Sequence, residues 1–286
     1  MSVGGGDAAD AADASAPAPA DEALLREVAE GLGRSPRQLS PRFFYDTRGS
    51  ELFEEITRLP EYYPTRTERA LLDRWMPSWI RDVCPAALVE LGAGSAVKTR
   101  ILLDAMEEAG AGGLFVPLDV SGEFLEATVE ALRVEYPDLA VEPEVADLTR
   151  PFDLSVRLPS PTLFAFLGST LGNFEDPAAV RLLSHLRATM RVTDRVLLGA
   201  DLKPGTGKSV ARLESAYNDS RGVTAAFNLN MLGALNRDLG TDFDVGAFEH
   251  RAFWAEGEGR IEMHLVARCA TLVNVPGRPP VRIAAG

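Results

Sequence analysis

The sequence predicts an α/β protein built on a Rossmann-like parallel sheet, and three observations lead to this fold class. An apolar run at 87–91 is followed at once by a turn with two glycines and then by helical spacing of apolar residues over 98–110. Two later apolar runs, 114–119 and 162–167, have the length and composition of buried strands. Strand and helix patterns alternate until about residue 200, as in the crossover units of a parallel sheet.

Composition limits the classes of protein that this chain can belong to. Its 286 residues are enough for one large or two small domains with cores of their own. There are 42 acidic against 29 basic side chains, and the net charge of −13 would repel a nucleic-acid backbone. No apolar run approaches the ~18 residues of a membrane span, and the N-terminus has no basic segment followed by an apolar one. We therefore expect a cytoplasmic protein that binds neither nucleic acid nor membrane.

The cysteines and histidines show no spacing typical of a disulfide framework or a metal site. Cys84 and Cys269 lack CxxC spacing, and we expect both to be buried, reduced thiols. The three histidines, His185, His250 and His264, lie far apart without the spacing of metal ligands. We expect no metal ion.

The N-terminal region begins with a segment of low complexity. Residues 1–20 are almost wholly Ala, Asp, Gly, Pro and Ser, and we expect them to form a disordered tail. Asp21 has the character of an N-cap for an amphipathic helix, and a second helix is predicted over 50–59. The pattern Thr65-x-x-Glu68 is that of a capping box, which predicts the start of a third helix.

The glycine turn after the first strand indicates what kind of ligand the sheet binds. The strand ends in Glu90-Leu-Gly92-Ala-Gly94, and glycines there let the backbone turn sharply and approach a ligand closely. A dinucleotide fingerprint requires a third glycine where this chain has Val97, which counts against a nicotinamide-dependent oxidoreductase. The remaining acidic-x-Gly-x-Gly pattern is also compatible with a plain strand-to-helix turn.

Polar side chains follow three successive strands of the predicted sheet. Asp119 ends the second strand, in the position where a nucleoside-binding sheet places an acid to accept hydrogen bonds from ribose hydroxyls. Asp147 follows a third strand near 139–145, and Asn173 lies in the glycine-rich loop after the fourth. Each of these residues alone is equally typical of a helix cap or a turn. Together with Glu90, Asp119 and Asp147 place acids at the ends of three successive strands, which favours a binding site.

The alternation of strand and helix ends after a fifth strand at 195–200. The remaining chain predicts two helices followed by two strands, at 210–218, 223–239, 248–254 and 260–267. We expect this part, 201–286, to join residues 21–66 in a split accessory lobe over the carboxyl edge of a sheet domain formed by 67–200. The substrate pocket would then lie between the lobe and the sheet.

Several blocks of this chain resemble one enzyme family. The first, over 44–68, is Phe-Tyr-Asp-x-x-Gly-Ser-x-Leu-Phe-x-x-Ile-Thr-x-Leu-Pro-Glu-Tyr-Tyr-Pro-Thr-Arg-Thr-Glu; further blocks are Val-Glu-Leu-Gly-Ala-Gly-Ser-x-x-Lys-Thr-Arg over 89–100 and Phe-Leu-Gly-Ser-Thr-x-Gly-Asn over 166–173. They are similar to the ergothioneine-pathway L-histidine Nα-methyltransferases, and the resemblance covers nearly all of the chain after about residue 40. It implies a class I methyltransferase sheet and S-adenosyl-L-methionine as methyl donor. It also implies transfer of three methyl groups to the α-amino nitrogen of histidine, which gives hercynine.

The resemblance assigns five cofactor contacts. Gly92, Lys98 and Asp119 match positions that bind the cofactor, with Asp119 at the ribose. Asp147 matches the position that contacts the adenine amino group. Leu148 stands where the family usually has an aromatic residue, and it offers less stacking surface.

The resemblance also assigns the substrate side of the pocket. Tyr45 is the candidate catalytic residue and Tyr62 its neighbour, and we hypothesise that both orient the substrate amine, because an unperturbed tyrosine is a poor base at neutral pH. Asn173 and Tyr217 match positions that bind the amino-acid group, and Met263 matches one that lines the imidazole pocket. By residue type alone, the tyrosines are as well explained as packing aromatics and Met263 as core filler.

One departure from the family leaves alternatives open. The family pattern continues past the position of Gly286 into a segment whose Glu and Ser hold the imidazole and whose strands close the sheet, and we expect these to be absent from the 286 residues. One alternative is therefore a methyltransferase for another small amino-acid amine, and another is a catalytically incomplete cofactor-binding subunit. A monomer is expected unless another chain supplies the segment.

Overall fold

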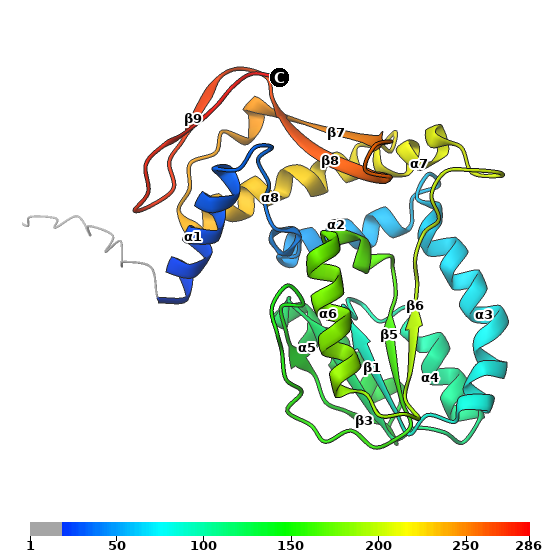
Figure 1. Cartoon of the computed structure of the whole chain (residues 1–286). Helices are drawn as coiled ribbons and strands as arrows, with labels where there is room; N and C mark the ends of the chain where they lie inside the picture. Colours follow the sequence, from blue (N-terminus) through cyan, green and yellow to red (C-terminus); the bar gives the residue numbers. More distant parts are fainter. Residues whose placement is uncertain (1–18) are drawn as a thin grey trace, which may run out of the picture.

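The computed structural model describes residues 19–286, and a parallel sheet flanked by helices forms the lower half of the molecule in Figure 1. The strands are ordered β3-β2-β1-β5-β6, with β4 also paired to β2, and every pair is parallel. Their bounds are β1 Ala87–Leu91, β2 Leu114–Asp119, β3 Ala140–Val141, β4 Glu144–Val145, β5 Thr162–Phe166 and β6 Arg195–Leu198. The predicted Rossmann-like fold class is thus confirmed.

The order of the strands creates the place for a ligand. From β1 the chain first adds β2, β3 and β4 on one side and then crosses back to add β5 and β6 on the other. All five residues of β1 and of β5 are buried, as expected for strands covered on both faces. The loops after these two strands diverge at the carboxyl edge, and open α/β sheets bind ligands at such a switch point.

Helices cover both faces of the sheet. One face packs against α3 (Tyr63–Val83), α4 (Thr99–Glu108) and α5 (Gly122–Glu135). The other face packs against α6 (Asp176–Thr189) and the irregular segment 146–158. In Figure 1 these layers form the lower half of the molecule.

The remaining elements form a lobe above the carboxyl edge of the sheet (Figure 1). They are α1 Pro19–Leu32, η1 Pro41–Phe44, α2 Thr47–Thr57, α7 Val210–Tyr217, α8 Val223–Leu239, η3 Val245–Ala247, β7 Phe248–Ala255, β8 Arg260–Ala267, β9 Thr271–Val273 and β10 Val281–Ile283. One apolar cluster joins α1 and α8 to the strands, and a second joins α2 to α7 and α8. The first and last parts of the described chain therefore pack together, and α3 connects them to the sheet through Tyr63 at its start and Leu72 further along.

The structure corrects several predictions for individual elements. The third strand, predicted over 139–145, is two short strands separated by Pro143, which has no backbone N–H for a ladder hydrogen bond. Helix α2 begins at Thr47, three residues before its predicted start, and its N-cap is Asp46, whose carboxylate accepts from the N–H of Gly49. The β9–β10 hairpin was not predicted.

Three further predictions were wrong, and one lies beyond what is described. Helix α1 includes Pro19 and Ala20, so Asp21 lies within the helix and is not its N-cap. Helix α3 begins at Tyr63, so Thr65 and Glu68 lie within the helix and form no capping box. Cys84 and Cys269 are both exposed, although they were expected to be buried. The disordered tail predicted over 1–20 falls, apart from its last two residues, outside the described residues.

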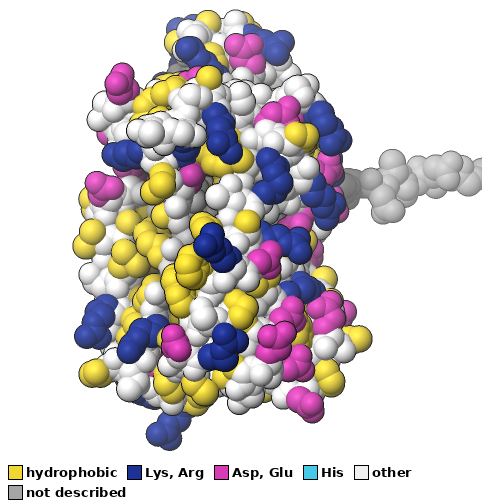
Figure 2. Space-filling model, turned by 90° about the vertical axis from the view of Figure 1, so that its right-hand side faces the viewer, with side chains coloured by type: hydrophobic (Ala, Val, Ile, Leu, Met, Phe, Trp, Pro, Cys, Tyr) yellow, Lys and Arg dark blue, Asp and Glu magenta, His cyan; other side chains and the backbone are white. Residues whose placement is uncertain are grey.

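The outer face along α3 is partly apolar. Figure 2 looks onto this side and shows apolar side chains gathered among charged ones. Trp75 and Trp79 of α3 are 42% and 49% exposed, and Val196 of the edge strand β6 is 43% exposed. None of the helices within residues 19–286 combines the length and the apolar character needed to cross a bilayer.

Candidate active site

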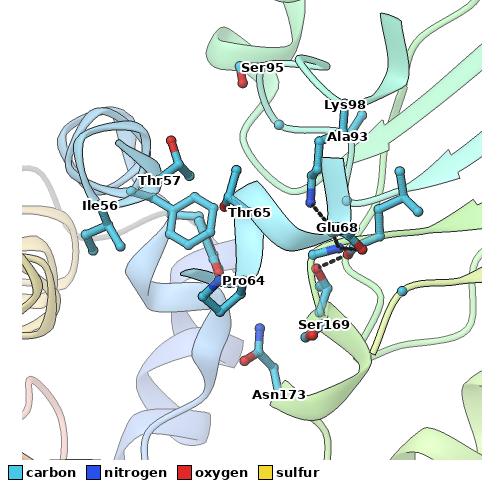
Figure 3. A pocket seen from close by; sticks show the side chains of 18 of the residues that line it. Ile56, Thr57, Pro64, Thr65, Glu68, Ala93, Ser95, Lys98, Ser169 and Asn173 are labelled. Carbon is cyan, nitrogen blue, oxygen red and sulfur yellow. Dashed lines mark hydrogen bonds and ion pairs between the residues drawn. The ribbon is translucent and has the colours of Figure 1, made fainter. Parts of the chain in front are cut away.

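A cavity of about 710 Å³ lies between the carboxyl edge of the sheet and the lobe. Its walls come from the loops after β1, β2, β4, β5 and β6 and from η1, α2, α3, α7, α8 and β8. Figure 3 shows part of it, with Thr65 and Glu68 of α3 facing Ala93 and Lys98 on one side and Asn173 on another. Every residue assigned to the site from the sequence lines this cavity: Tyr45, Tyr62, Gly92, Lys98, Asp119, Asp147, Leu148, Asn173, Tyr217 and Met263.

The glycine turn after β1 is held in one conformation by hydrogen bonds. Gly92 has φ +76° and Gly94 φ +52°, in the left-handed region that side chains disfavour. The N–H of Gly92 donates to the carbonyl of Leu118 at 2.9 Å, and Ser95 donates its hydroxyl proton to Glu54 of α2 at 2.5 Å. The turn is therefore anchored to β2 on one side and to the lobe on the other.

Asp119 stands at the end of β2 and fixes the same turn. Its carboxylate accepts hydrogen bonds from the N–H of Gly94 at 2.9 Å and from the N–H of Ser121 at 3.0 Å. A carboxylate has about four acceptor positions, so two such bonds leave room for the hydroxyls of a ribose.

Asp147 is engaged by more partners than its predicted role requires. Arg42 of η1 donates to one carboxylate oxygen at 2.6 Å, and Thr149 donates its hydroxyl and backbone protons to the other. Leu148 lies next to it on the cavity wall and belongs to the apolar clusters beneath α6. Arg42 of the lobe thus contacts Asp147, the residue that the family resemblance assigns to the adenine.

Lys98 forms an ion pair inside the cavity. Its ammonium lies 2.5 Å from a carboxylate oxygen of Glu68, and the two side chains are 20% and 16% exposed. The same carboxylate accepts from the N–H of Gly168 in the loop after β5, at 2.9 and 3.0 Å to its two oxygens. One acidic side chain of α3 therefore joins the loop after β1 to the loop after β5.

Glu90, the acid before the glycine turn, lines the cavity although it is almost fully buried. It is only 2% exposed, and it accepts a hydrogen bond from the hydroxyl of Thr99. Burial raises the pKa of Glu90 to about 8, although the Thr99 hydrogen bond and the charge of Lys98 act in the opposite direction. Its carboxyl group is thus largely protonated at neutral pH.

Three tyrosines gather on the lobe side of the cavity. Burial raises the pKa of Tyr45 to about 12, the negative charge of Asp119 adds to the shift, and a hydrogen bond from Asn173 opposes it. Burial also raises the pKa of Tyr217 to about 12 and that of Tyr62 well above its usual value, and the rings of these two residues pack edge to face with centroids 5.8 Å apart. All three are therefore neutral phenols at physiological pH, able to donate or accept hydrogen bonds but not to act as ionised bases.

The remaining wall combines one amide with apolar groups. Asn173 ends the short helix η2 (Thr170–Asn173), which follows the left-handed residue Ser169 with φ +59°. Met263 of β8 packs in the apolar cluster that also holds Phe53 and Phe227. The aromatic rings of these two phenylalanines lie 5.9 Å apart.

Sequence reasoning missed several polar residues of the cavity, and we describe three of them. Arg42, Glu68 and Asp201 all line it, and Asp201 accepts from the hydroxyl of Tyr63 at 2.5 Å and pairs with Lys208 at 2.6 Å. Arg42 lies just before the family-like block at 44–68, and Glu68 ends it, so their position next to that block was the available signal.

The residues fit a nucleoside that carries an amino-acid group. Gly92 and Gly94 have no side chains, so the ligand could approach the backbone closely there. Asp119 would accept hydrogen bonds from hydroxyls of the ligand, and Lys98 would pair with its carboxylate. Within residues 19–286, no group of three or more His, Cys, Asp or Glu side chains is arranged to bind a metal ion.

Known proteins resemble the chain over most of its length. The family model described as "Histidine-specific methyltransferase, SAM-dependent" matches residues 24–286. The histidine N-alpha-methyltransferase of Mycolicibacterium smegmatis is 45% identical over 90% of this chain and 78% of that protein. That of Mycobacterium tuberculosis is 45% identical over 92% of this chain and 78% of that protein. Ergothioneine biosynthesis protein 1 of Schizosaccharomyces pombe is 28% identical over 81% of this chain and 31% of that protein. The chain therefore belongs to the family of histidine-specific methyltransferases that depend on S-adenosylmethionine.

Proposed function

We propose that this protein transfers methyl groups from S-adenosylmethionine to the α-amino nitrogen of L-histidine. The observation that carries the proposal is a single cavity, of about 710 Å³, in which Lys98 and Asp119 line one part and Tyr62 and Asn173 another. The names of the mycobacterial relatives and the length of the match support histidine as substrate. By its resemblance to the ergothioneine-pathway enzymes, the product is the trimethylated amine, hercynine.

The main contribution of the protein to this reaction is to position the methyl donor and the substrate amine. The cofactor supplies an electrophilic methyl group on a sulfonium, and the attacking nitrogen must be neutral and in line with it. We assign Gly92, Lys98, Asp119, Asp147 and Leu148 to the cofactor, as their places on the cavity wall allow. The lobe that covers the sheet edge would limit the access of water to the reacting atoms.

The tyrosines would orient the substrate rather than deprotonate it. Tyr45 and Tyr62 are neutral phenols, because burial raises the pKa of each. A neutral hydroxyl can accept a proton of the amine in a hydrogen bond and thereby direct the lone pair. Asn173 and Tyr217 supply donors for the carboxylate of the amino acid, and Met263 with its aromatic neighbours supplies an apolar wall for the side chain.

We further propose that residues 21–66 and 201–286 act together as the substrate-binding lobe and residues 67–200 as the cofactor-binding domain. The shared apolar clusters of α1, α2, α7 and α8 support this division. The proposed boundary at 66 and 67 falls inside α3, whose first turn packs with the lobe and whose later turns pack on the sheet.

The proposal is tested by titration calorimetry and by product analysis. S-adenosylhomocysteine is titrated first into the purified chain, and histidine, tryptophan and α-N-acetylhistidine follow in separate cells. Mass spectrometry of a reaction with S-adenosylmethionine then counts the methyl groups on histidine. We expect binding and methylation of histidine and no methylation of the acetylated compound, because the lone pair of its α-nitrogen is delocalised into the amide.

Two results would contradict the proposal in different ways. Binding of S-adenosylhomocysteine together with methylation of tryptophan but not histidine would keep the reaction and replace the substrate. No binding of S-adenosylhomocysteine by a folded chain would remove the cofactor assignment of Lys98 and Asp119.

A further inference from the structure

Glu68 occupies the centre of the site without having a role in the cofactor or substrate assignment. The sequence predicted that Thr65 and Glu68 form a capping box at the start of α3. The helix begins at Tyr63, five residues before Glu68, and the carboxylate of Glu68 points into the cavity. There it binds the ammonium of Lys98 at 2.5 Å (Figure 3). The side chain is only 16% exposed, so the pair is largely shielded from solvent.

The second partner of Glu68 is the loop that carries Asn173. Both carboxylate oxygens accept from the N–H of Gly168, which has φ +78° and begins the turn into η2. Ser169 follows with φ +59°, and Asn173 ends η2 four residues later. A hydrogen bond at the first residue of such a constrained turn helps to set the direction of the short helix that follows it.

The carboxylate of Glu68 occupies space that is open because residue 199 is a glycine. A Cβ atom on Gly199, just after β6, would lie 1.7 Å from a carboxylate oxygen of Glu68. Any residue larger than glycine there would displace the side chain. Glu68 is therefore held between the ends of β5 and β6 and the loop after β1.

We propose that Glu68 is a positioning residue that aligns the cofactor and the substrate with each other. It fixes the ammonium of Lys98 on the cofactor side and the Gly168 turn, and with it Asn173, on the substrate side. Tyr62 is the N-cap of the same helix, α3, so Lys98, the Gly168 turn and Tyr62 are all placed relative to one rigid element. An in-line displacement depends on such relative placement, and a misplacement of ~1 Å can cost on the order of 100-fold in rate.

This inference rests on the proposed function, because it names a residue that serves the same site. The alternative is that Glu68 only stabilises the fold by joining three loops. The two differ in coupling: a positioning role through Lys98 requires that the effects of changing Glu68 and Lys98 on cofactor affinity are not additive. A purely structural role lowers the unfolding temperature and leaves the two effects independent.

The test is a double-mutant cycle read by titration calorimetry with S-adenosylhomocysteine. The chains compared are the wild type, E68Q, K98M and the double variant. We expect E68Q to weaken binding about 10-fold, the size of a lost charge-assisted hydrogen bond, and to add little in the K98M background. The control is E135Q, which breaks the pair of Glu135 with Arg100 (2.6 Å) on the surface and should leave binding unchanged.

A second arm reads the substrate side. At saturating S-adenosylhomocysteine, E68Q should weaken histidine binding several-fold and K98M should weaken it less. Glu68 accepts the hydrogen bond from the N–H of Gly168, whereas the ammonium of Lys98 only lies beside that residue. If E68Q does not fold, G199A replaces it, since the added methyl group displaces the carboxylate and keeps the charge. Additive effects in the cycle, or unchanged affinity in E68Q, would overturn the proposal. If the wild type binds S-adenosylhomocysteine but not histidine, the proposed substrate fails while the cycle still decides the coupling of Glu68 to Lys98.

Discussion

The guanidinium of Arg42 lies 2.6 Å from the carboxylate of Asp147, which we propose to contact adenine. The two residues are 105 positions apart in the sequence, and both side chains are less than one-fifth exposed. Arg42 belongs to η1 of the lobe and Asp147 to the sheet domain, so their ion pair holds one part over the other. It also orients the carboxylate before any ligand is bound.

Replacing Arg42 with Gln should therefore weaken the binding of S-adenosylhomocysteine. We expect a loss of about 3- to 10-fold, as for one charge-assisted hydrogen bond in a partly buried site. R150Q is the matched control, because Arg150 approaches the same carboxylate only to 3.5 Å and is 53% exposed. Titration calorimetry checks both variants. Tighter binding by R42Q would mean that Arg42 competes with adenine for Asp147.

Replacing Tyr62 with Phe should separate substrate binding from cofactor binding. The change removes a hydroxyl from a residue of the cavity wall and keeps the ring that packs against Tyr217; the residue is 7% exposed. We expect histidine affinity to fall about 10-fold and S-adenosylhomocysteine affinity to change less than about 2-fold. Y136F, which removes a hydroxyl bonded to Asp104 at 2.6 Å outside the cavity, is the control. Equal losses for both ligands, measured by calorimetry, would reject a substrate role for Tyr62.

The strands of the sheet were predictable because their signal is local. β1 and β5 are short apolar runs bounded by glycine or proline, and burial on both faces of a parallel sheet leaves that signature in the sequence. The third strand was harder, since Pro143 divides it into two pairs of residues. The positions of the cofactor and substrate residues came from the resemblance to a family, and the structure places them around one cavity.

The contacts of Glu68 and Arg42 could not be predicted from local patterns. Thr65-x-x-Glu68 has the spacing of a capping box, yet the partners of Glu68 are 30 and 100 residues away. Arg42 pairs with a residue still more distant. A single sequence carries no information on which charges meet across such distances; the packing of the lobe on the sheet decides it.

Replacing Tyr45 with Phe should lower the rate without changing the shape of the pH profile. Burial and the charge of Asp119 raise the pKa of Tyr45 to about 12, so the phenol stays protonated between pH 6 and 10 and does not titrate in the assay range. We expect kcat/KM to fall roughly 10-fold or more at every pH, because a hydrogen bond that orients the amine is lost. The rise of activity with pH should remain, since it reports deprotonation of the substrate amine. Loss of that rise in Y45F would identify Tyr45 as the base.

Replacing Glu90 with Gln should raise the stability of the protein relative to the wild type as the pH rises. The pKa of Glu90 is raised from 4.5 to about 8 by burial, so the folded state binds the proton more tightly than the unfolded state does. Its contribution to stability is therefore fully present below about pH 4.5 and is lost as the pH rises through about 8, at roughly 1.4 kcal/mol per pH unit between them. Gln does not titrate, so the difference in unfolding free energy between E90Q and wild type should shift in favour of E90Q, by an amount on the order of a few kcal/mol, between pH 5.5 and 8.5. Urea unfolding at several pH values measures this difference.

In E135Q the same difference should stay flat over this range, because Arg100 lowers the pKa of Glu135 and its titration lies at more acid pH. A flat difference for E90Q as well would show that Glu90 is ionised in the folded protein at neutral pH.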